Sequence, residues 1–218
     1  MSAPDVSVLY NALRAYGSST VGAVLDDMGL GGIITKLRAV APGLRFAGPA
    51  FTVKLEVGEL GSAHESEFKI GEYIDKPAPG AVVAIDMAGA AVSALGGIAT
   101  RVAQMRGLEA IVIDGGSRDL DETRVMGFPL FVRHSLPVTG RRRVRFISTG
   151  VPIQLDGVAV APEDILVGDD TGIVRVPRGA LTEVAARANA IDARDRRVRE
   201  FVEQGIGFSD AFQKASKN

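Results

Sequence analysis

Apolar residues recur along this chain with two spacings, and each spacing predicts a different kind of element. Residues 4–15 place apolar side chains three or four positions apart, as an amphipathic helix does. The hydroxyls of residues 18–20 can cap a second helix, which the glycine-rich segment 29–32 ends after Met28. Two consecutive helices are therefore expected before the first strand.

The next part of the chain predicts three strands and one helix. Residues 51–57 alternate like a half-buried strand, whereas residues 80–85 and 109–114 are apolar runs typical of buried strands. Residues 64–73 are expected to form a helix before the first of these two buried strands.

A further helix is expected between the two buried strands. Residues 95–106 carry Ile98, Val102 and Met105 on one helical face, and Gly107 ends the helix. A strand, a helix and a strand within about thirty residues predict a right-handed βαβ crossover with parallel strands.

The second half of the chain predicts short strands followed by a long helix. Turn signals at residues 156–157 and 170–172 indicate hairpins. Residues 178–204 have the pattern of a long amphipathic helix, and such a projecting helix often packs on a neighbouring subunit. The expected short strands lie at residues 128–133, 143–148, 151–155, 158–161 and 172–176.

Length and composition favour a single α/β domain over residues 1–218. The chain has 46% hydrophobic and 23% charged residues, which is typical of a globular domain. The net charge of −1 gives no general attraction to nucleic acids or acidic membranes, so neither is an expected partner. Cysteine is absent, which excludes disulfides and thiolate metal sites and is compatible with a reducing cytoplasm.

No targeting or membrane segment is expected either. The first five residues lack the basic and apolar regions of a signal peptide. The longest weakly polar run, residues 81–99, contains Asp86 and is mostly Ala and Gly, so it is interpreted as strand, loop and helix start. A cytoplasmic location is expected.

The strongest candidate for chemistry follows the second buried strand. A short glycine loop there delivers Arg118, Asp119 and Glu122, while Gly97 lies at the start of the preceding helix. Strand ends and helix N-termini at one sheet edge are where α/β proteins place ligands. Arg grips a carboxylate through two parallel hydrogen bonds, and Asp holds a divalent cation. This combination predicts a small anionic substrate and a metal.

The same residues also have a purely structural interpretation. Arg118 and Asp119 can form an ion pair at a helix start, where the dipole and capping favour Asp. Asp119 and Glu122 have the spacing of a capping box, so a structural role for Glu122 is at least as well supported as a functional one. Residue types alone favour this structural interpretation.

Other reactive residues have weaker signals. Asp86 and Asp114 each end a buried strand, so either can line a site, although a turn or cap role is favoured. Lys54 is interpreted as a solvated edge lysine rather than a Schiff-base residue. His64 and His134 have no metal-ligand spacing.

A basic run at residues 141–145 contains four arginines. It suggests contact with RNA or an acidic partner, but no aromatic residues are interleaved with it. A short charged loop is the favoured interpretation.

The chain contains a spaced motif that resembles the signature of the RraA-like family. The motif is Gly97, twenty residues, Arg118-Asp119, two residues and Glu122. That family includes the regulator of ribonuclease E activity. It also includes divalent-metal-dependent 4-hydroxy-4-methyl-2-oxoglutarate/4-carboxy-4-hydroxy-2-oxoadipate aldolases, which also decarboxylate oxaloacetate. The likeness covers most of the chain, with further stretches in register at residues 20–30, 48–53, 79–86, 127–131, 162–164 and 169–174.

The resemblance implies a fold, a site and an activity. The family fold is a swivelling β/β/α domain, usually assembled as trimers or hexamers. Backbone N–H groups near Gly97, Ile98 and Ala99 would hold the carboxylate of a pyruvate-like substrate, together with Arg118. Asp119 would bind Mg²⁺ or Mn²⁺. The implied activity is a lyase acting on small α-keto acids.

The resemblance also leaves a second function open, and the chain departs from the family's aldolases at two positions. A non-catalytic regulator that binds a ribonuclease would need no metal. Aldolases of the family tend to have acids where Gly97 and Ala23 stand, and Asp26 or Asp27 lies one turn from the latter. A further family acid on the C-terminal helix corresponds to Asp195. Loss of outer carboxylates typically lowers activity ~10–100-fold.

Overall fold

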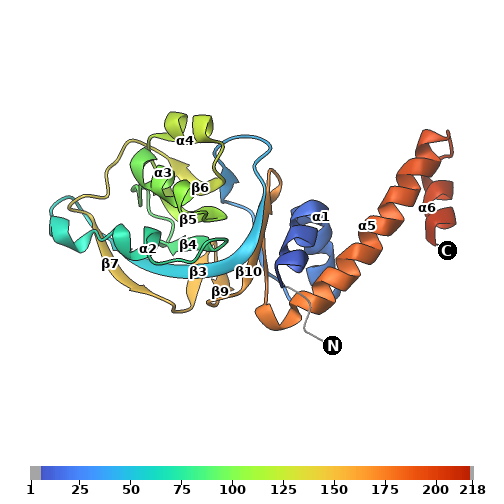
Figure 1. The fold of residues 1–218 in the computed structure, drawn as a ribbon, viewed down its shortest axis with the longest axis horizontal. Coiled ribbons are helices and arrows are strands. Elements are labelled where there is room, and N and C mark those ends of the chain that lie inside the picture. Colours follow the sequence, from blue (N-terminus) through green and yellow to red (C-terminus); the bar gives the residue numbers. More distant parts are fainter. Residues whose placement is uncertain (1–5, 217–218) are drawn as a thin grey trace.

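The protein is built on four parallel strands in the middle of a mixed sheet. The computed structural model describes residues 6–216 (Figure 1). Neighbouring strands run parallel in the order β3–β4–β5–β6, and Val82 of β4 pairs with Ala50 on one side and Ala110 on the other. The bounds are Phe46–Val57 (β3), Val82–Asp86 (β4), Ala110–Ser117 (β5) and Leu130–Ser135 (β6).

Antiparallel strands extend this sheet on both sides. The first half of β3 pairs with β10, and its second half pairs with β7, so one long strand belongs to both parts of the sheet. Strands β8 and β9 form a separate two-stranded sheet. The bounds are Ile33–Ile34 (β1), Arg38–Ala39 (β2), Val144–Thr149 (β7), Ile153–Leu155 (β8), Val158–Val160 (β9), Ile165–Asp169 (β10) and Gly172–Val176 (β11).

Short helices cover one face of the parallel strands. Helix α3 (Gly97–Met105) connects β4 to β5, and α4 (Leu120–Met126) follows β5 directly. Both lie above the sheet in Figure 1. The predicted strand–helix–strand crossover is therefore confirmed, since β4 and β5 are parallel neighbours joined through α3.

Long helices lie at the other end of the molecule. Helix α1 (Val6–Asp27) packs against β10, β11 and α5 (Leu181–Glu203), which follows a short 3-10 turn at Arg178–Ala180. Figure 1 shows the second half of α5 projecting away from the sheet, with α6 (Phe208–Ser216) folded back along it. Val198, Ala211 and Ala215 form a small core of their own there. The prediction of a long C-terminal helix is confirmed, whereas α6 was not predicted.

The turns and short helices agree with the sequence pattern at some positions and differ from it at others. Both hairpins are confirmed, because β8 pairs with β9 across residues 156–157 and β10 pairs with β11 across residues 170–171. The helix predicted over residues 64–73 is wrong: a 3-10 turn (Glu65–Glu67) and a single α-turn, α2 (Gly71–Ile74), occupy it. The helical conformation is interrupted between them at Phe68, whose φ of −85° and ψ of 78° are not helical.

The two helices predicted at the start form one bent helix. Residues 4 and 5 lie outside the described residues, and α1 bends at Gly17, where φ is 85° and ψ is 166°. The hydroxyl of Ser18 does not cap the second half as predicted. Instead, Asp169 accepts hydrogen bonds from the Ser18 backbone N–H (2.8 Å) and from its Oγ (2.7 Å). A Cβ at position 17 would lie 2.9 Å from the same carboxylate, so glycine permits this approach.

Asp169 therefore ties the bend in α1 to the β10–β11 hairpin. It also accepts from the Thr171 backbone N–H at 2.9 Å, and the residue is only 8% exposed. Burial raises the pKa of Asp169, but the hydrogen bonds from Ser18 and Thr171 and the charge of Arg45 outweigh it and hold the pKa below its ordinary value. Within residues 6–216, no helix is both long and apolar enough to cross a membrane.

Replacing Asp169 with Asn is expected to lower the free energy of unfolding by about 1–3 kcal/mol near neutral pH, because buried hydrogen bonds to a charged acceptor are weakened. The lowered pKa means that this stabilisation is present above the unfolded-state value of about 3.9 and is lost as the pH falls through the folded-state value. Urea unfolding of both proteins between about pH 3 and pH 7 measures the difference. An identical acid dependence in the variant would contradict this role.

Candidate active site

A pocket of about 660 Å³ lies where β5 ends and α3 begins. Its lining includes Gly96, Ile98 and Ala99 from the start of α3, and Arg118 and Asp119 from the end of β5. The predicted residues Ile98, Ala99, Arg118 and Asp119 therefore come together, although the two pairs are far apart in the sequence. Gly97 and Glu122 line a neighbouring pocket, which shares Ile98 with this one. The pocket is larger than pyruvate requires and is of the size that holds small organic ligands.

The side chain of Asp119 points to the start of α3 rather than capping its own helix. Asp119 occupies the N-cap position of α4 with a φ of 57°, in the left-handed region that is uncommon for residues other than glycine. Its side chain makes no capping hydrogen bond there. Instead, Oδ2 accepts from the Gly97 backbone N–H at 3.2 Å and lies 3.5 Å from Arg118 Nε. The capping-box interpretation of Asp119 and Glu122 is therefore wrong.

Two glycines allow the carboxylates to approach the backbone of α3. A Cβ at position 96 would lie 2.3 Å from Asp119 Oδ2, and a Cβ at Gly97 would lie 2.0 Å from Glu122 Oε2. Both distances are shorter than a van der Waals contact, so a larger residue would force the carboxylate to move. The carboxylate of Glu122 thus occupies the space in which a side chain at position 97 would begin.

The start of α3 also offers backbone donors. Gly96 is its N-cap and has no side chain, and Asp119 Oδ2 accepts from the N–H of Gly97 only. The N–H groups of a first helical turn have no partner within the helix and carry the positive end of its dipole. The N–H groups of Ile98 and Ala99 therefore suit an anionic group held in the pocket, beside the Arg118 guanidinium.

The side chains of the pocket suit an ion such as Mg²⁺ better than an ion that must be surrounded by protein ligands. Within residues 6–216, no cluster of three or more acidic or histidine side chains is arranged for a metal. Mg²⁺, however, usually keeps several waters and takes only one or two protein carboxylates together with substrate oxygens. Asp119 is half-exposed at the pocket wall and can supply such a carboxylate.

Other candidate acids lie elsewhere in the chain. Asp195 is on α5, where it pairs with Arg194 at 2.9 Å. Ala23, Asp26 and Asp27 are exposed on α1. Figure 1 shows α1 and α5 together at the end of the molecule away from α3 and α4. Within one chain, none of these residues lines the pocket.

Only one residue of the apolar face predicted for α3 packs against the core: Val102 does, whereas Ile98 and Met105 do not. Ile98 is 85% exposed and Met105 is 77% exposed, while Gly97, Thr100 and Ala103 are buried against the sheet. Val125 on the neighbouring α4 is 90% exposed. These three exposed residues, Ile98, Met105 and Val125, are referred to below as the α3–α4 face.

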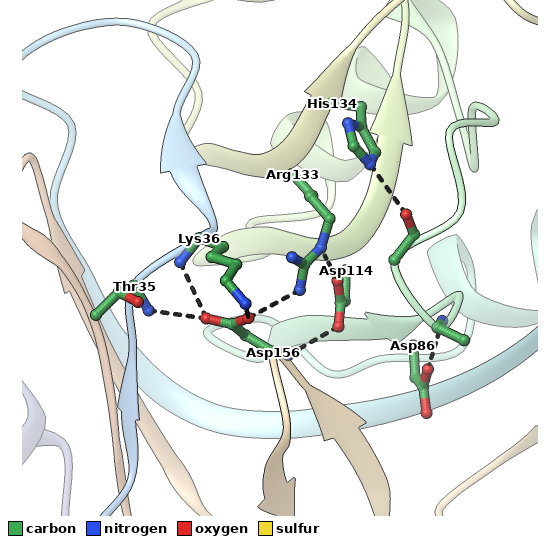
Figure 2. A network of polar contacts seen from close by, with 9 residues as sticks. Thr35, Lys36, Asp86, Asp114, Arg133, His134 and Asp156 are labelled. Atoms are coloured by element: carbon green, nitrogen blue, oxygen red, sulfur yellow. Dashed lines mark hydrogen bonds and ion pairs between the residues drawn. The ribbon is translucent and has the colours of Figure 1, made fainter.

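A second pocket, of about 760 Å³, is lined by Asp86, Asp114 and Asp156, whose polar contacts are drawn in Figure 2. Asp86 accepts from Lys54 Nζ at 2.7 Å and from the Ala88 backbone N–H at 2.8 Å, so the predicted turn role of Asp86 is confirmed. Lys54 is not an edge lysine, because its strand β3 has neighbours on both sides, and its half-exposed side chain is ion-paired. His134 contacts the Gly89 carbonyl through Nε2 at 2.9 Å.

Asp156 holds this second pocket together. It lies in the β8–β9 turn and accepts from Arg133 at 3.1 Å and from the backbone N–H groups of Thr35 and Lys36, while its own N–H donates to Asp114 at 2.7 Å (Figure 2). Burial raises the pKa of Asp156, but these hydrogen bonds outweigh it and hold the pKa below its ordinary value. The cluster is internally neutralised, which favours a structural role.

Sequence reasoning missed much of the lining of the first pocket, including Glu65, Asp75 and a third charged residue, Arg141. Arg141, assigned to a charged loop, lines the same pocket as Arg118 and Asp119. Arg141 is far from Arg118 in the sequence and lies among other arginines, so no local signal marked it. Only the path of the chain after β6 brings residues 139–141 to α3.

Comparison with known proteins identifies relatives along most of the chain. A family model described as "RraA-like: Aldolase/RraA" matches residues 21–175. A 4-hydroxy-4-methyl-2-oxoglutarate aldolase of Thermus thermophilus is 26% identical over 134 residues, which cover 61% of this chain and 76% of the relative. The chain spans only 31% of the length of DlpA of Legionella pneumophila and 55% of that of a Methanocaldococcus jannaschii protein that it also matches.

Two crystal structures share the fold over nearly the whole chain. An uncharacterized protein from Pseudomonas syringae pv. tomato DC3000 has a TM-score of 0.85 and 28% identity, covering 96% of this chain and 98% of its own. RraAS2 of Streptomyces coelicolor, described as an unusual member of the RNase ES inhibitor RraA protein family, has a TM-score of 0.79 and 25% identity, covering 94% of this chain and 100% of its own. The mixed α/β fold with a long C-terminal helix is common to these proteins.

Replacing Gly96 with Ala is expected to leave the protein folded but to displace Asp119, because the new methyl group would lie 2.3 Å from its carboxylate. The rise in melting temperature caused by Mg²⁺ plus oxalate should fall by more than half. Gly179→Ala is the matched control, since a Cβ at that position meets no atom within 4 Å. An unchanged ligand-induced rise in Gly96→Ala would show that the glycine is not needed for this approach.

Proposed function

Because the chain belongs to the RraA-like (Aldolase/RraA) family, we propose that it is a divalent-metal-dependent lyase acting on pyruvate-derived α-keto acids. The observation that carries the proposal is the contact between Asp119 Oδ2 and the N–H of Gly97. Around one pocket lie a carboxylate suited to a cation, the Arg118 guanidinium and the residues Ile98 and Ala99 of the first turn of α3. The aldolase name of the Thermus relative supports the same activity.

The residues of the pocket suggest how the substrate is held. Arg118 and the N–H groups of Ile98 and Ala99 bind the α-keto acid end, through charge-assisted hydrogen bonds and the helix dipole. Asp119 holds Mg²⁺ or Mn²⁺, which when bound supplies Lewis-acid stabilisation of negative charge on the keto oxygen.

Retro-aldol cleavage then removes one proton from the substrate and adds one proton to the product. A base removes the proton of the C4 hydroxyl, C4 becomes a carbonyl, and the C3–C4 bond breaks. The electron pair forms the enolate of pyruvate, which is protonated at C3. Glu122 is the second carboxylate at the start of α3, where it lines a neighbouring pocket that shares Ile98 with the first, and we assign this proton transfer to it. Decarboxylation of oxaloacetate gives the same enolate with loss of CO₂.

This assignment addresses one of the two missing family acids. The carboxylate of Glu122 begins where a side chain at position 97 would lie, so Gly97 and Glu122 together keep an acid at this place. Asp195 can serve the site only from another subunit, since it is remote within one chain.

We also propose that the protein is a homo-oligomer, a trimer or a hexamer, in which copies meet through the α3–α4 face. Its three large apolar side chains are exposed on adjoining helices. Contiguous exposed apolar surface of this kind usually marks a contact with another protein. The face begins at Ile98, which also lines the pocket, so a second copy would border the site.

One observation favours a second function, a protein-binding regulator of ribonuclease E activity. The structural relative RraAS2 belongs to a family of ribonuclease inhibitors. Such a regulator would bind its ribonuclease through surface complementarity and would need neither a metal nor Asp119.

The lyase predicts pyruvate release from 4-hydroxy-4-methyl-2-oxoglutarate and from oxaloacetate, which a chelator abolishes. Asp119→Ala should lower kcat/KM by about 100-fold or more, because it removes the proposed cation ligand. Asp210→Ala, which removes an exposed acid on α6, is the control and should leave the rate unchanged.

Folded wild-type protein that releases no pyruvate from either substrate would contradict the lyase. Inhibition of a ribonuclease that is equally strong in wild type and Asp119→Ala would then support the regulator.

Val125→Glu is expected to dissociate or shrink the oligomer, because it places a charge in the apolar contact. Light scattering after gel filtration measures the mass, and Leu60→Glu, which alters an exposed leucine outside the α3–α4 face, is the control. A wild-type mass near the 22.8 kDa of one chain would contradict assembly.

A further inference from the structure

The arginines of residues 141–145 do not share one role. Arg145 donates to Glu67 Oε1 at 2.7 Å and to Glu56 Oε2 at 3.1 Å. Arg143 Nη1 donates to the Thr139 carbonyl at 3.2 Å. Arg142 has a φ of 63°, and its guanidinium lies beside Gly61. The side chains of Arg143 and Arg145 thus fasten the loop to its surroundings.

Arg141 differs from its neighbours because it lines the pocket that contains Arg118 and Asp119. Its backbone N–H donates to Thr139 Oγ1 at 3.2 Å. Within residues 6–216, its guanidinium makes no ion pair and no hydrogen bond. A cation that has no protein partner and borders a ligand pocket is available to an anionic group of the ligand.

The backbone that carries Arg141 is held firmly against the segment leading into α3. The Ser93 N–H donates to the Val138 carbonyl at 3.0 Å, and the Val144 N–H donates to the Gly140 carbonyl at 2.8 Å. A Cβ at Gly140 would lie 2.4 Å from the Ser93 carbonyl oxygen, so the two segments touch through backbone atoms. The position of residue 141 relative to Gly96 is therefore fixed by the fold.

We propose that Arg141 is a specificity-determining residue that binds a second carboxylate of the substrate. The inference rests on the proposed function, in which Arg118 and the start of α3 hold the first carboxylate. The substrate class is thus narrowed to α-keto acids with a distal carboxylate, of which 4-hydroxy-4-methyl-2-oxoglutarate is one.

The other charges of the pocket are consistent with this assignment. Glu65 and Asp75 also line it and repel a carboxylate from their part of the wall. Asp119 faces the cation proposed above. Arg118 and Arg141 then remain as the two cationic groups of the lining, which match the two carboxylates of the substrate. The pocket volume of about 660 Å³ leaves room for both ends.

Binding tests this inference without any need for turnover. Calorimetry in Mg²⁺ compares 2-oxoglutarate with 2-oxopentanoate, which has the same chain length but no distal carboxylate. Wild type is expected to bind 2-oxoglutarate about 10- to 100-fold more tightly, the range of a charge-assisted hydrogen bond to a charged partner. Arg141→Gln should abolish this preference, and Arg142→Gln, which removes the same charge from the next position, should keep it.

Pyruvate release provides a second readout. In Arg141→Gln, kcat/KM should fall about 10- to 100-fold for 4-hydroxy-4-methyl-2-oxoglutarate and change little for 4-hydroxy-2-oxopentanoate, which lacks the distal carboxylate.

The outcomes separate this inference from the proposed function. A preference for 2-oxoglutarate that depends on Arg141, in a protein that releases no pyruvate, would support the role of Arg141 and contradict the lyase. Equal binding of both probes by wild type, binding of neither, or an unchanged preference in Arg141→Gln would overturn the inference.

Discussion

The strand β3 is the element on which the rest of the structure depends. Its first half pairs with β10 and its second half pairs with β4 and β7, so its backbone hydrogen bonds hold the α1–α5 end and the α3–α4 end of the molecule in one sheet. Buried backbone polar groups must be paired, and β3 pairs on both sides. The register of β4 and β5 against β3 then sets where the loops that carry the pocket begin.

The pocket is shaped by how closely backbone and carboxylates approach each other. Gly96 and Gly97 leave no Cβ between the start of α3 and the acids of the next loop, so Asp119 and Glu122 reach the positive end of a helix dipole. The left-handed conformation of Asp119 directs its side chain across to α3 and away from its own helix. Backbone strain of this kind concentrates at functional sites.

The polar clusters of this protein differ in whether all of their charged groups have partners within the protein. The Asp156 cluster pairs each buried charge with an opposite charge or a backbone N–H, and it joins four segments of the chain. In the pocket beside α3, by contrast, the Arg141 guanidinium has no protein partner among the described residues, and in the first turn of α3 Asp119 takes up only the N–H of Gly97. Unsatisfied donors beside a cavity favour binding of an anion, whereas a neutralised cluster favours stability.

The sequence by itself determined the parallel core, both hairpins, the long C-terminal helix and the grouping of Arg118 and Asp119, since hydrophobic spacing, turn residues and a spaced motif are local signals. Only the tertiary structure decided which side chains those elements meet. Asp169 bonds the start of the second half of α1 in place of the predicted hydroxyl caps, Ile98 and Met105 of α3 face outward, and Arg141 lines the pocket. Each of these outcomes depends on contacts between residues far apart in the chain, which no local pattern encodes.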